Sequence, residues 1–371
     1  MRPARTGRVW RFTSGRFARN LPGKIMRKRS LRGALAAGLL AGLVSFFTAP
    51  AAPNESGGLL AITDENDAWS NFFGPHQDRH YTHGLKLTYL AADDFLPDTT
   101  AWLNQIPQWG MEKAVGNVGV VAGQNMFTPE NILDPQPIPT DRPYAGWLYA
   151  GLVFQRHAEP AANVAVMENF EINFGVVGHH SYADAAQKLI HRWRFPEDIP
   201  QGWDNQIENE PGLILKYARL WRLAPTAGTA KYFDVIPRAG IELGNVAILG
   251  TVGAAARLGF NLPPDFGVQI IDSPASANGR LPSSAWFSSY VFAGVEGRAV
   301  LHDITLDGNS FRNGPSVEKY NFVNDLSWGL ALQAGRHFEF SYAQVTRSKE
   351  FVGQQHKDVF GSLELKFFFA F

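Results

Sequence analysis

Five residues in three separate segments have the types that hydrolytic chemistry uses: Asn66, Asp67, Thr82, His191 and Glu197. His191 could take a proton from water or a hydroxyl near neutral pH, and the nearby Glu197 could hold its tautomer, as in a catalytic triad. Asp67, helped by Asn66 or main-chain carbonyls, offers the hard oxygen ligands that Ca²⁺ takes. A cation beside an acyl carbonyl would stabilise the developing oxyanion, and peptide N–H groups around Thr82 could contribute to the same task.

Each of these residues also has an ordinary structural interpretation. The acidic run that ends at Asp67 could be a solvated turn at a strand end, and His191 could be an ordinary exposed residue of a surface helix. Glu197 follows Pro196 and could belong to a turn. Spacing alone does not decide between a site and a surface, so the outcome depends on whether the fold brings the three segments together.

The elements that must position these residues are strands, because many segments alternate apolar with polar or small side chains. That period is typical of a sheet with two unlike faces. In the final segment, Leu363, Leu365 and Phe367 oppose Glu364 and Lys366. We predict twelve strands, at residues 59–66, 80–91, 117–127, 145–156, 165–177, 212–223, 231–244, 247–260, 287–301, 325–334, 337–347 and 359–371.

The alternation fits two architectures. In a soluble sandwich the polar faces look outward to water, whereas in a membrane barrel the apolar face contacts lipid and the polar face lines the interior. An export signal, aromatic residues at strand ends and a chain that finishes on Phe371 favour the barrel, and the terminal aromatic residue resembles the signature by which the barrel assembly machinery recognises outer-membrane proteins. We therefore predict an all-β, antiparallel transmembrane β-barrel of twelve strands, an even number that places both chain ends in the periplasm.

The N-terminal residues predict export. Residues 1–54 contain 11 basic residues and no acidic one, and the apolar run 33–47 precedes small residues in an A-x-A arrangement at 49–51. These are the three parts of a secretory signal peptide; an arginine-rich transit peptide is the alternative. We predict an N-terminal extension and signal peptide at residues 1–51, with Met1 or Met26 as the start, and an outer-membrane barrel domain at 52–371.

Composition excludes several classes of protein. After residue 54 the chain holds 23 basic and 34 acidic residues, a net charge of −11, so we predict no nucleic-acid partner. The sequence has no cysteine, which excludes disulfides and thiolate metal sites. After residue 52 no apolar stretch is long enough to predict a membrane-spanning helix.

Strand order assigns each connection to one side of the barrel. The segment 178–211 is the longest external connection, and within it residues 185–193 predict a short helix with Gln187 and His191 on one face. Asp67, Thr82 and His191 then converge on the external rim. The other predicted external connections are 67–79, 128–144, 302–324 and 348–358, whereas 92–116 and 261–286 fall on the periplasmic side and are long for periplasmic turns.

Several motifs resemble those of the outer-membrane lipid A 3'-O-deacylase family, in the same order over about residues 59–371. The first motifs are the Glu65-Asn66-Asp67 run and the stretch 78–84 with its Tyr-Thr-x-Gly sequence. The others are the runs 141–149, 175–178 leading to Gln187 and His191, 202–206, 306–309 and 349–354. Agreement over most of the chain is far more specific than any single motif.

The resemblance implies a twelve-stranded barrel that removes an acyloxyacyl group from lipid A with the help of Ca²⁺. It implies that His191 is the general base, that Asp67 is a cation ligand, and that Asn66 and Thr82 are polar groups of the site. It also implies that Glu197 orients His191. The run 141–149 lies at the start of a strand, and we interpret it as structural rather than catalytic.

The sequence departs from the family pattern at two places. His83 stands where the family commonly has Asn or a small residue, and His179 and His180 replace a Gly-Pro-like turn. These changes could alter the lip of the site and the choice of lipid without removing the chemistry.

Three functional hypotheses follow. The first is an outer-membrane esterase that cleaves an ester-linked acyl chain of lipid A or lipopolysaccharide from the external side, with Ca²⁺ as cofactor. The second keeps the chemistry but takes glycerophospholipid as substrate, as outer-membrane phospholipases do. The third is a non-enzymatic barrel with a pore or adhesive function.

Overall fold

The structure is a computed structural model that describes residues 57–70, 78–92, 101–107, 109–112, 114–279 and 285–369. The predicted signal peptide, most of the first external connection and the terminal Phe371 lie outside these residues. Within the described part of the chain no helix is long and apolar enough to cross a membrane.

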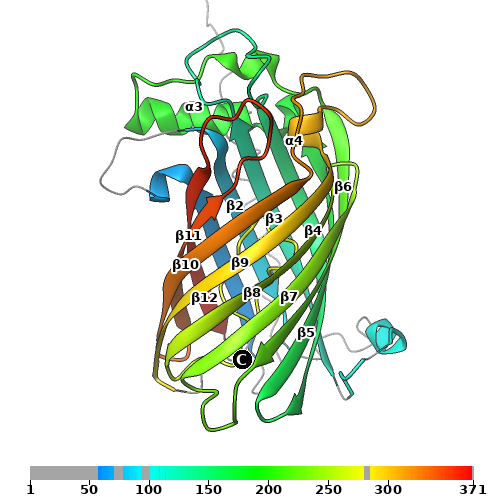
Figure 1. Ribbon diagram of the computed structural model, residues 1–371, viewed down its shortest axis with the longest axis vertical. Helices are drawn as coiled ribbons and strands as arrows, with labels where there is room; N and C mark the ends of the chain where they lie inside the picture. The colour runs from blue at the N-terminus through cyan, green and yellow to red at the C-terminus, as the bar shows by residue number, and fades with distance from the viewer. Residues whose placement is uncertain are drawn as a thin grey trace, which may run out of the picture. The chain divides into compact units, whose positions relative to one another are not determined.

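The described residues form one closed sheet of twelve strands, as predicted (Figure 1). Each strand pairs antiparallel with its neighbours in the sequence, and β1 pairs with β12 to close the barrel. The strands are β1 (Gly58–Asn66), β2 (His80–Leu90), β3 (Val115–Thr128), β4 (Ala145–Ala161), β5 (Val164–Val177), β6 (Glu210–Leu223), β7 (Phe233–Gly244), β8 (Ala247–Phe260), β9 (Phe287–Asp303), β10 (Phe322–Ala334), β11 (Phe338–Arg347) and β12 (Asp358–Phe369).

Helices lie in the connections between the strands. The predicted helix is present as α3 (Ala183–Arg194), and a single turn, α4 (Ile304–Asp307), follows β9. Both lie at the same end of the barrel, which we call the α3 end (Figure 1). Short 3-10 helices are η2 (Asp67–Ser70), η3 (Ala101–Gln105), η4 (His179–Ser181) and η5 (Gly202–Asn205).

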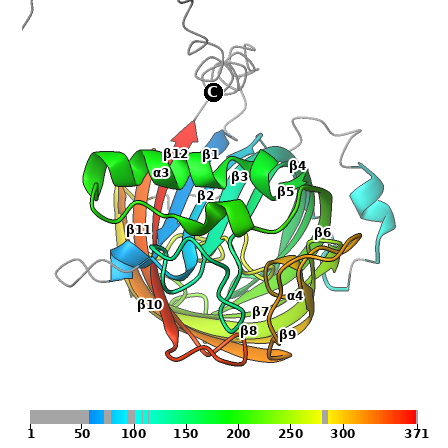
Figure 2. The same ribbon diagram turned by 90° about the horizontal axis from the view of Figure 1, so that it is seen from above.

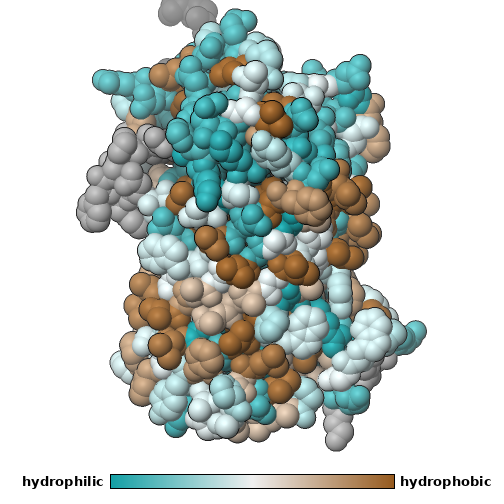
Figure 3. All heavy atoms as spheres, in the orientation of Figure 1, coloured by the Kyte–Doolittle hydropathy of each residue, from teal (hydrophilic) through white to brown (hydrophobic). Residues whose placement is uncertain are grey.

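Alternation along the strands separates a charged interior from an apolar exterior. Inside, Lys86 pairs with Glu171 at 2.9 Å and Lys366 with Glu339 at 3.0 Å. Outside, side chains such as Val252 are exposed, and hydrophobic residues gather in a band over β7–β10 below a more hydrophilic upper end (Figure 3). Ion pairs stay stable in the interior because each charge has a partner, and the apolar exterior suits lipid.

The long connection between β8 and β9 lies inside the barrel. Residues 261–279 fold back into the lumen, where yellow loops are visible inside the ring of strands in Figure 2. Ile271 N donates to Glu65 Oε1 of β1, Gln155 Nε2 of β4 donates to Asn278 O, and Ser273 Oγ donates to Glu296 Oε2 of β9. Contacts with strands on opposite sides of the barrel place this luminal segment inside it.

The filled lumen predicts that the barrel does not conduct ions. In a planar lipid bilayer the purified protein should give no steady current, because the luminal segment and the ion pairs around it occupy the passage. Addition of an open porin to the same bilayer is the control for sensitivity. Reproducible stepwise conductance from this protein alone would contradict the prediction.

The second long connection, between β2 and β3, packs against the outer wall at the other end of the barrel. Arg156 of β4 donates through Nη2 to Pro107 O, and its Nε lies 2.6 Å from Glu168 Oε2 of β5. Trp102 packs edge-on against Phe154 and Phe170. This connection therefore covers the ion pair of Arg156 and Glu168 on the outward face of the wall.

Candidate active site

The helix α3 packs on the outward face of the barrel wall. Met126 of β3 pairs with Gly146 of β4, and Gly146 lies an even number of residues before the exposed Leu152 on the same strand. Because side chains alternate between the two faces of a strand, both positions face outward. Ala183 packs against Met126, and a Cβ at Gly146 would lie 2.6 Å from the Ala183 Cβ, too close for a side chain. Glycine here lets the start of α3 approach the wall.

His191 and Gln187 both contact one carboxylate, that of Asp78. Asp78 Oδ2 lies 2.6 Å from His191 Nε2 and accepts a hydrogen bond from Gln187 Nε2 at 2.8 Å. Gln187 Oε1 in turn accepts from Trp203 Nε1 at 2.7 Å. The predicted shared face of Gln187 and His191 is confirmed, and it points at the segment that leads into β2.

Asp67 is held at the top of β1 by the short turn that follows it. Asn66 Oδ1 accepts from Ala68 N at 2.7 Å, which closes an Asx-type turn. Asp67 Oδ2 accepts from Arg79 N at 2.8 Å, whereas the buried Asp67 Oδ1 has no hydrogen-bond partner among the described residues. Burial and the negative charge of Asp78 raise the pKa of Asp67 well above its ordinary value.

Thr82 occupies a β-bulge. The pairing of β2 with β3 shifts between Tyr81 and His83, which leaves Thr82 as the extra residue. Its buried Oγ1 lies 2.7 Å from Thr128 Oγ1. Bulges re-aim side chains next to active sites, and this one lets Tyr81 point into the lumen, where it contacts Glu65, while His83 stays on the outward face.

His83 forms a second histidine and carboxylate pair on the outward face. Its Nε2 lies 3.0 Å from Asp64 Oδ2, and Trp69 Nε1 donates to Asp64 Oδ1 at 2.5 Å. His83 is paired in register with Asn66 across β1 and β2. This departure from the family pattern therefore lies beside two of the predicted site residues.

The structure brings Asp67 and His191 together at one rim. Asp67 contacts the backbone N–H of Arg79, and His191 contacts the side chain of Asp78, the preceding residue. Consecutive residues have Cα atoms ~3.8 Å apart, so the two groups lie within about 10 Å of each other. Thr82 follows four residues after Asp78, at the same rim.

The carboxylate that contacts His191 differs from the one that the sequence predicts. The carboxylate beside His191 is Asp78, not Glu197, whose side chain is exposed after the end of α3. Asp78 belongs to the motif at residues 78–84, but the sequence alone predicts no role for it. Two features of the sequence point to Asp78 indirectly. The helix face with Gln187 and His191 needs a hydrogen-bond acceptor, and Asp78 lies in a segment predicted to reach the same rim.

The Asp78 and His191 pair predicts a pH dependence. Burial lowers the pKa of His191, but the hydrogen bond and charge of Asp78 outweigh it and raise the pKa above its ordinary value of 6.5. The predicted role of His191 as a general base requires a neutral imidazole, so activity should rise with pH through a midpoint above 6.5. In Asp78→Asn that midpoint should move to lower pH, and the maximal rate should fall at least about tenfold because Asn can hold the wrong tautomer. A pH profile of initial rates would test this, and an unchanged midpoint would contradict it.

The comparisons with known proteins identify the family. The sequence matches the family model described as "Outer membrane protein LpxR" over residues 37–369. The chain belongs to the LpxR family. Among solved structures, LpxR from Salmonella typhimurium has a TM-score of 0.65 and 22% identity, and the match covers 84% of this chain and 100% of that one.

Another solved structure matches with a lower score. The translocator domain of autotransporter NalP from Neisseria meningitidis has a TM-score of 0.38 and 10% identity, and the match covers 91% of this chain and 96% of that one. No curated protein matches the sequence significantly. The family match and the LpxR fold together establish an outer-membrane barrel.

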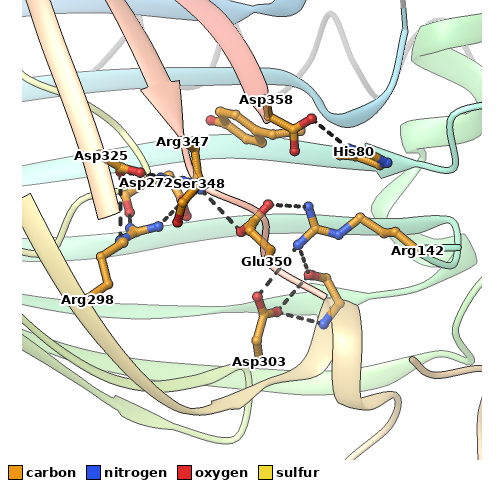
Figure 4. A network of polar contacts seen from close by, with 12 residues as sticks. His80, Arg142, Asp272, Arg298, Asp303, Asp325, Arg347, Ser348, Glu350 and Asp358 are labelled. Atoms are coloured by element: carbon orange, nitrogen blue, oxygen red, sulfur yellow. Dashed lines mark hydrogen bonds and ion pairs between the residues drawn. The ribbon is translucent and has the colours of Figure 1, made fainter. Parts of the chain in front are cut away.

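Residues of LpxR-family motifs that lie outside the site form hydrogen bonds and ion pairs between the connections of the α3 end (Figure 4). Buried Arg142, from the run 141–149, donates to Glu350 Oε2 at 3.0 Å, and Glu350 contacts Arg347 at 3.5 Å. Arg347 Nη1 donates to Asp272 Oδ2 of the luminal segment at 2.5 Å. These contacts agree with the structural interpretation of the run 141–149.

The same network reaches the site through His80. This residue has a positive φ of 57°, and its Nδ1 lies 2.6 Å from Asp358 Oδ1, while its Nε2 lies 3.4 Å from Asp141 Oδ1. His80 directly follows the Asp78 and Arg79 pair. The carboxylates of Asp141, in the connection before β4, and of Asp358, at the start of β12, therefore hold the backbone that presents Asp78 to His191 and the Arg79 N–H to Asp67.

The residues of this LpxR-family site fit a hard cation in part. Among the described residues, no group of three or more His, Asp or Glu side chains is arranged to hold a metal ion. The buried, unpartnered Asp67 Oδ1 and the like charge of Asp78 nevertheless make a place where a cation would relieve repulsion. Ca²⁺ completes its shell with amide, main-chain and water oxygens, so two carboxylates are compatible with it.

Proposed function

We propose that this LpxR-family protein is an external esterase of the outer membrane that removes an ester-linked acyl chain from lipid A. The observation that carries the proposal is the buried His191 and Asp78 pair, enclosed between α3 and the outward face of the wall, within about 10 Å of Asp67. A base on the outside of a barrel, rather than in its lumen, can meet a lipid that surrounds the barrel.

His191 serves as the general base in this proposal. A neutral imidazole has one donor and one acceptor nitrogen. An ionised Asp78 only accepts, so it selects the tautomer with the proton on Nε2. In this proposal Nδ1 is the nitrogen that takes a proton from water or a hydroxyl. The attacking oxygen then bonds to the acyl carbonyl carbon, and the ester bond to the lipid A oxygen breaks. The proton on Nδ1 passes to the leaving alkoxide.

Asp67 is the proposed ligand of Ca²⁺, with Asn66 holding the turn that presents it. When bound, Ca²⁺ supplies Lewis-acid stabilisation of the negative charge that forms on the acyl oxygen. Thr82 contributes a hydroxyl from the bulge, and Glu197 lies on the exposed rim, where it can contact the polar part of the lipid. Lipid A fits an external site because it occupies the outer leaflet.

A phospholipase is the second candidate, because the same base and carboxylates would serve a glycerophospholipid ester. The filled lumen counts against the third hypothesis, a pore. Purified protein should be incubated separately with lipid A and with phosphatidylethanolamine, each with Ca²⁺, and the products separated by mass spectrometry. Release of fatty acid from lipid A alone would support the proposal, whereas release from the phospholipid alone would overturn it.

A further inference from the structure

The helix that carries His191 also presents an apolar surface that faces away from the barrel. Successive residues of an α-helix are about 100° apart, so Leu189 and Trp193 lie on the side roughly opposite His191. His191 is 2% exposed, whereas Leu189 is 68% and Trp193 is 84% exposed. Tyr182 and Ile190 extend the same exposed surface. These four residues form what we call the outer face of α3.

The placement of α3 determines what the outer face meets. The inner side of the helix packs on Met126 and Gly146, whose positions face outward from the wall. In the view from above, α3 runs along the rim beside β1, β2 and β3 rather than across the lumen (Figure 2). The outer face is therefore turned away from the protein, toward whatever surrounds the barrel at the α3 end.

The wall below α3 is continuous with the lipid-facing surface. On β4 the outward positions after Gly146 lead to the exposed Leu152, and the neighbouring β5 presents Phe174, which is 61% exposed, three residues before that strand ends. The apolar exterior thus extends nearly to the level at which α3 docks. An apolar helix face at this level continues the membrane-facing surface.

Charge beside the outer face indicates the kind of surface it meets. Lys188 and the exposed Arg192 lie along one edge of it. A helix with one apolar face and Lys or Arg beside it is typical of helices that lie in a membrane interface, with the apolar face buried and the basic groups near phosphates. Lipid A carries such phosphates above its acyl chains.

We propose that the outer face of α3 inserts into the acyl layer of the outer leaflet, with Lys188 and Arg192 at the level of the lipid phosphates. The helix then anchors the site in the membrane, with His191 on its inner side and acyl chains on its outer side. The proposal rests on the external orientation given under Proposed function, but not on the hydrolytic chemistry.

The absence of cysteine from the chain permits a direct test. Single-cysteine variants Leu189→Cys and Trp193→Cys, in the full-length barrel, carry a nitroxide label in nanodiscs that contain lipid A. Val252→Cys on the strand exterior is the lipid reference, and Gln355→Cys on an exposed connection of the α3 end is the water reference. Collision rates with oxygen and with a water-soluble nickel chelate give the depth of each label.

The proposal expects the labels at 189 and 193 to resemble the one at 252, at a depth of roughly 5–10 Å below the phosphates. Labels at 189 and 193 that collide with the nickel chelate as often as the label at 355 would overturn it. Because this readout needs no turnover, it can fail while the esterase proposal stands, and it can succeed in a protein without activity. Heat-modifiable gel migration confirms that each variant is folded.

Discussion

Replacement of His191 with Ala should lower the rate of lipid A deacylation by roughly 10²–10⁴-fold, the usual contribution of a general base. The imidazole of His191 can take a proton near neutral pH, and Asp78 fixes which of its nitrogens does so. The measurement is the initial rate of fatty-acid release by purified protein at saturating lipid A and Ca²⁺. The effect should appear in the rate at saturation, because the base acts in the reaction step.

His180→Ala is the matched control for this variant. His180 precedes α3 in the same connection and is exposed, so its removal should leave the rate close to that of the wild type. His191→Ala should also keep the heat-modifiable migration of a folded barrel, because the twelve strands do not depend on this side chain. Activity of a folded His191→Ala within tenfold of the wild type would show that His191 is not the base.

Replacement of Asp67 with Asn should abolish the response to Ca²⁺ and lower the rate by about a thousandfold. The loss corresponds to several kcal/mol of charge stabilisation in the transition state, and about 1.4 kcal/mol equals a factor of ten. Asn keeps the size of the side chain but removes the charge from the buried, unpartnered oxygen. Initial rates over a range of Ca²⁺ concentrations, with a chelator as the zero point, measure both effects.

A binding measurement separates this prediction from a general loss of folding. Ca²⁺ should raise the melting temperature of the wild type, since a ligand that binds only the folded state stabilises it, and should not raise that of Asp67→Asn. Without Ca²⁺ the variant should be at least as stable as the wild type, because Asp67 no longer repels Asp78. Asp204→Asn, an exposed residue of η5, is the control. An Asp67→Asn protein that still responds to Ca²⁺ would remove Asp67 from the cation site.

The strand pattern could be predicted because it is local. Each residue of a strand alternates between lumen and lipid, so a period of two in the sequence identifies the strand without knowledge of its neighbours. All twelve strands and α3 lie where predicted, with ends that differ by up to five residues. The largest difference is at β4, which continues through Pro160 to Ala161. Proline usually marks a strand end, but an irregular hairpin beside β5 accommodates it.

The luminal segment and the partner of His191 could not be predicted in this way. Residues 261–279 carry no regular period, and their place inside the barrel depends on contacts such as Ile271 with Glu65, about 200 residues away. Asp78 and His191 are separated by 113 residues. Closeness in sequence and the family resemblance predict Glu197 as the orienting residue, whereas the carboxylate at the imidazole is that of Asp78, from a different connection.

Mass spectrometry of lipid A from cells that express the wild type, His191→Ala or His180→Ala tests most directly whether these residues form a working site at the outer surface. We expect lipid A that lacks an ester-linked acyl chain, with the mass loss of that chain, in cells with the wild type and with His180→Ala. Cells with His191→Ala should show unmodified lipid A while they contain the same amount of folded barrel. Unmodified lipid A in all three strains, or the same mass loss with His191→Ala, would contradict the account.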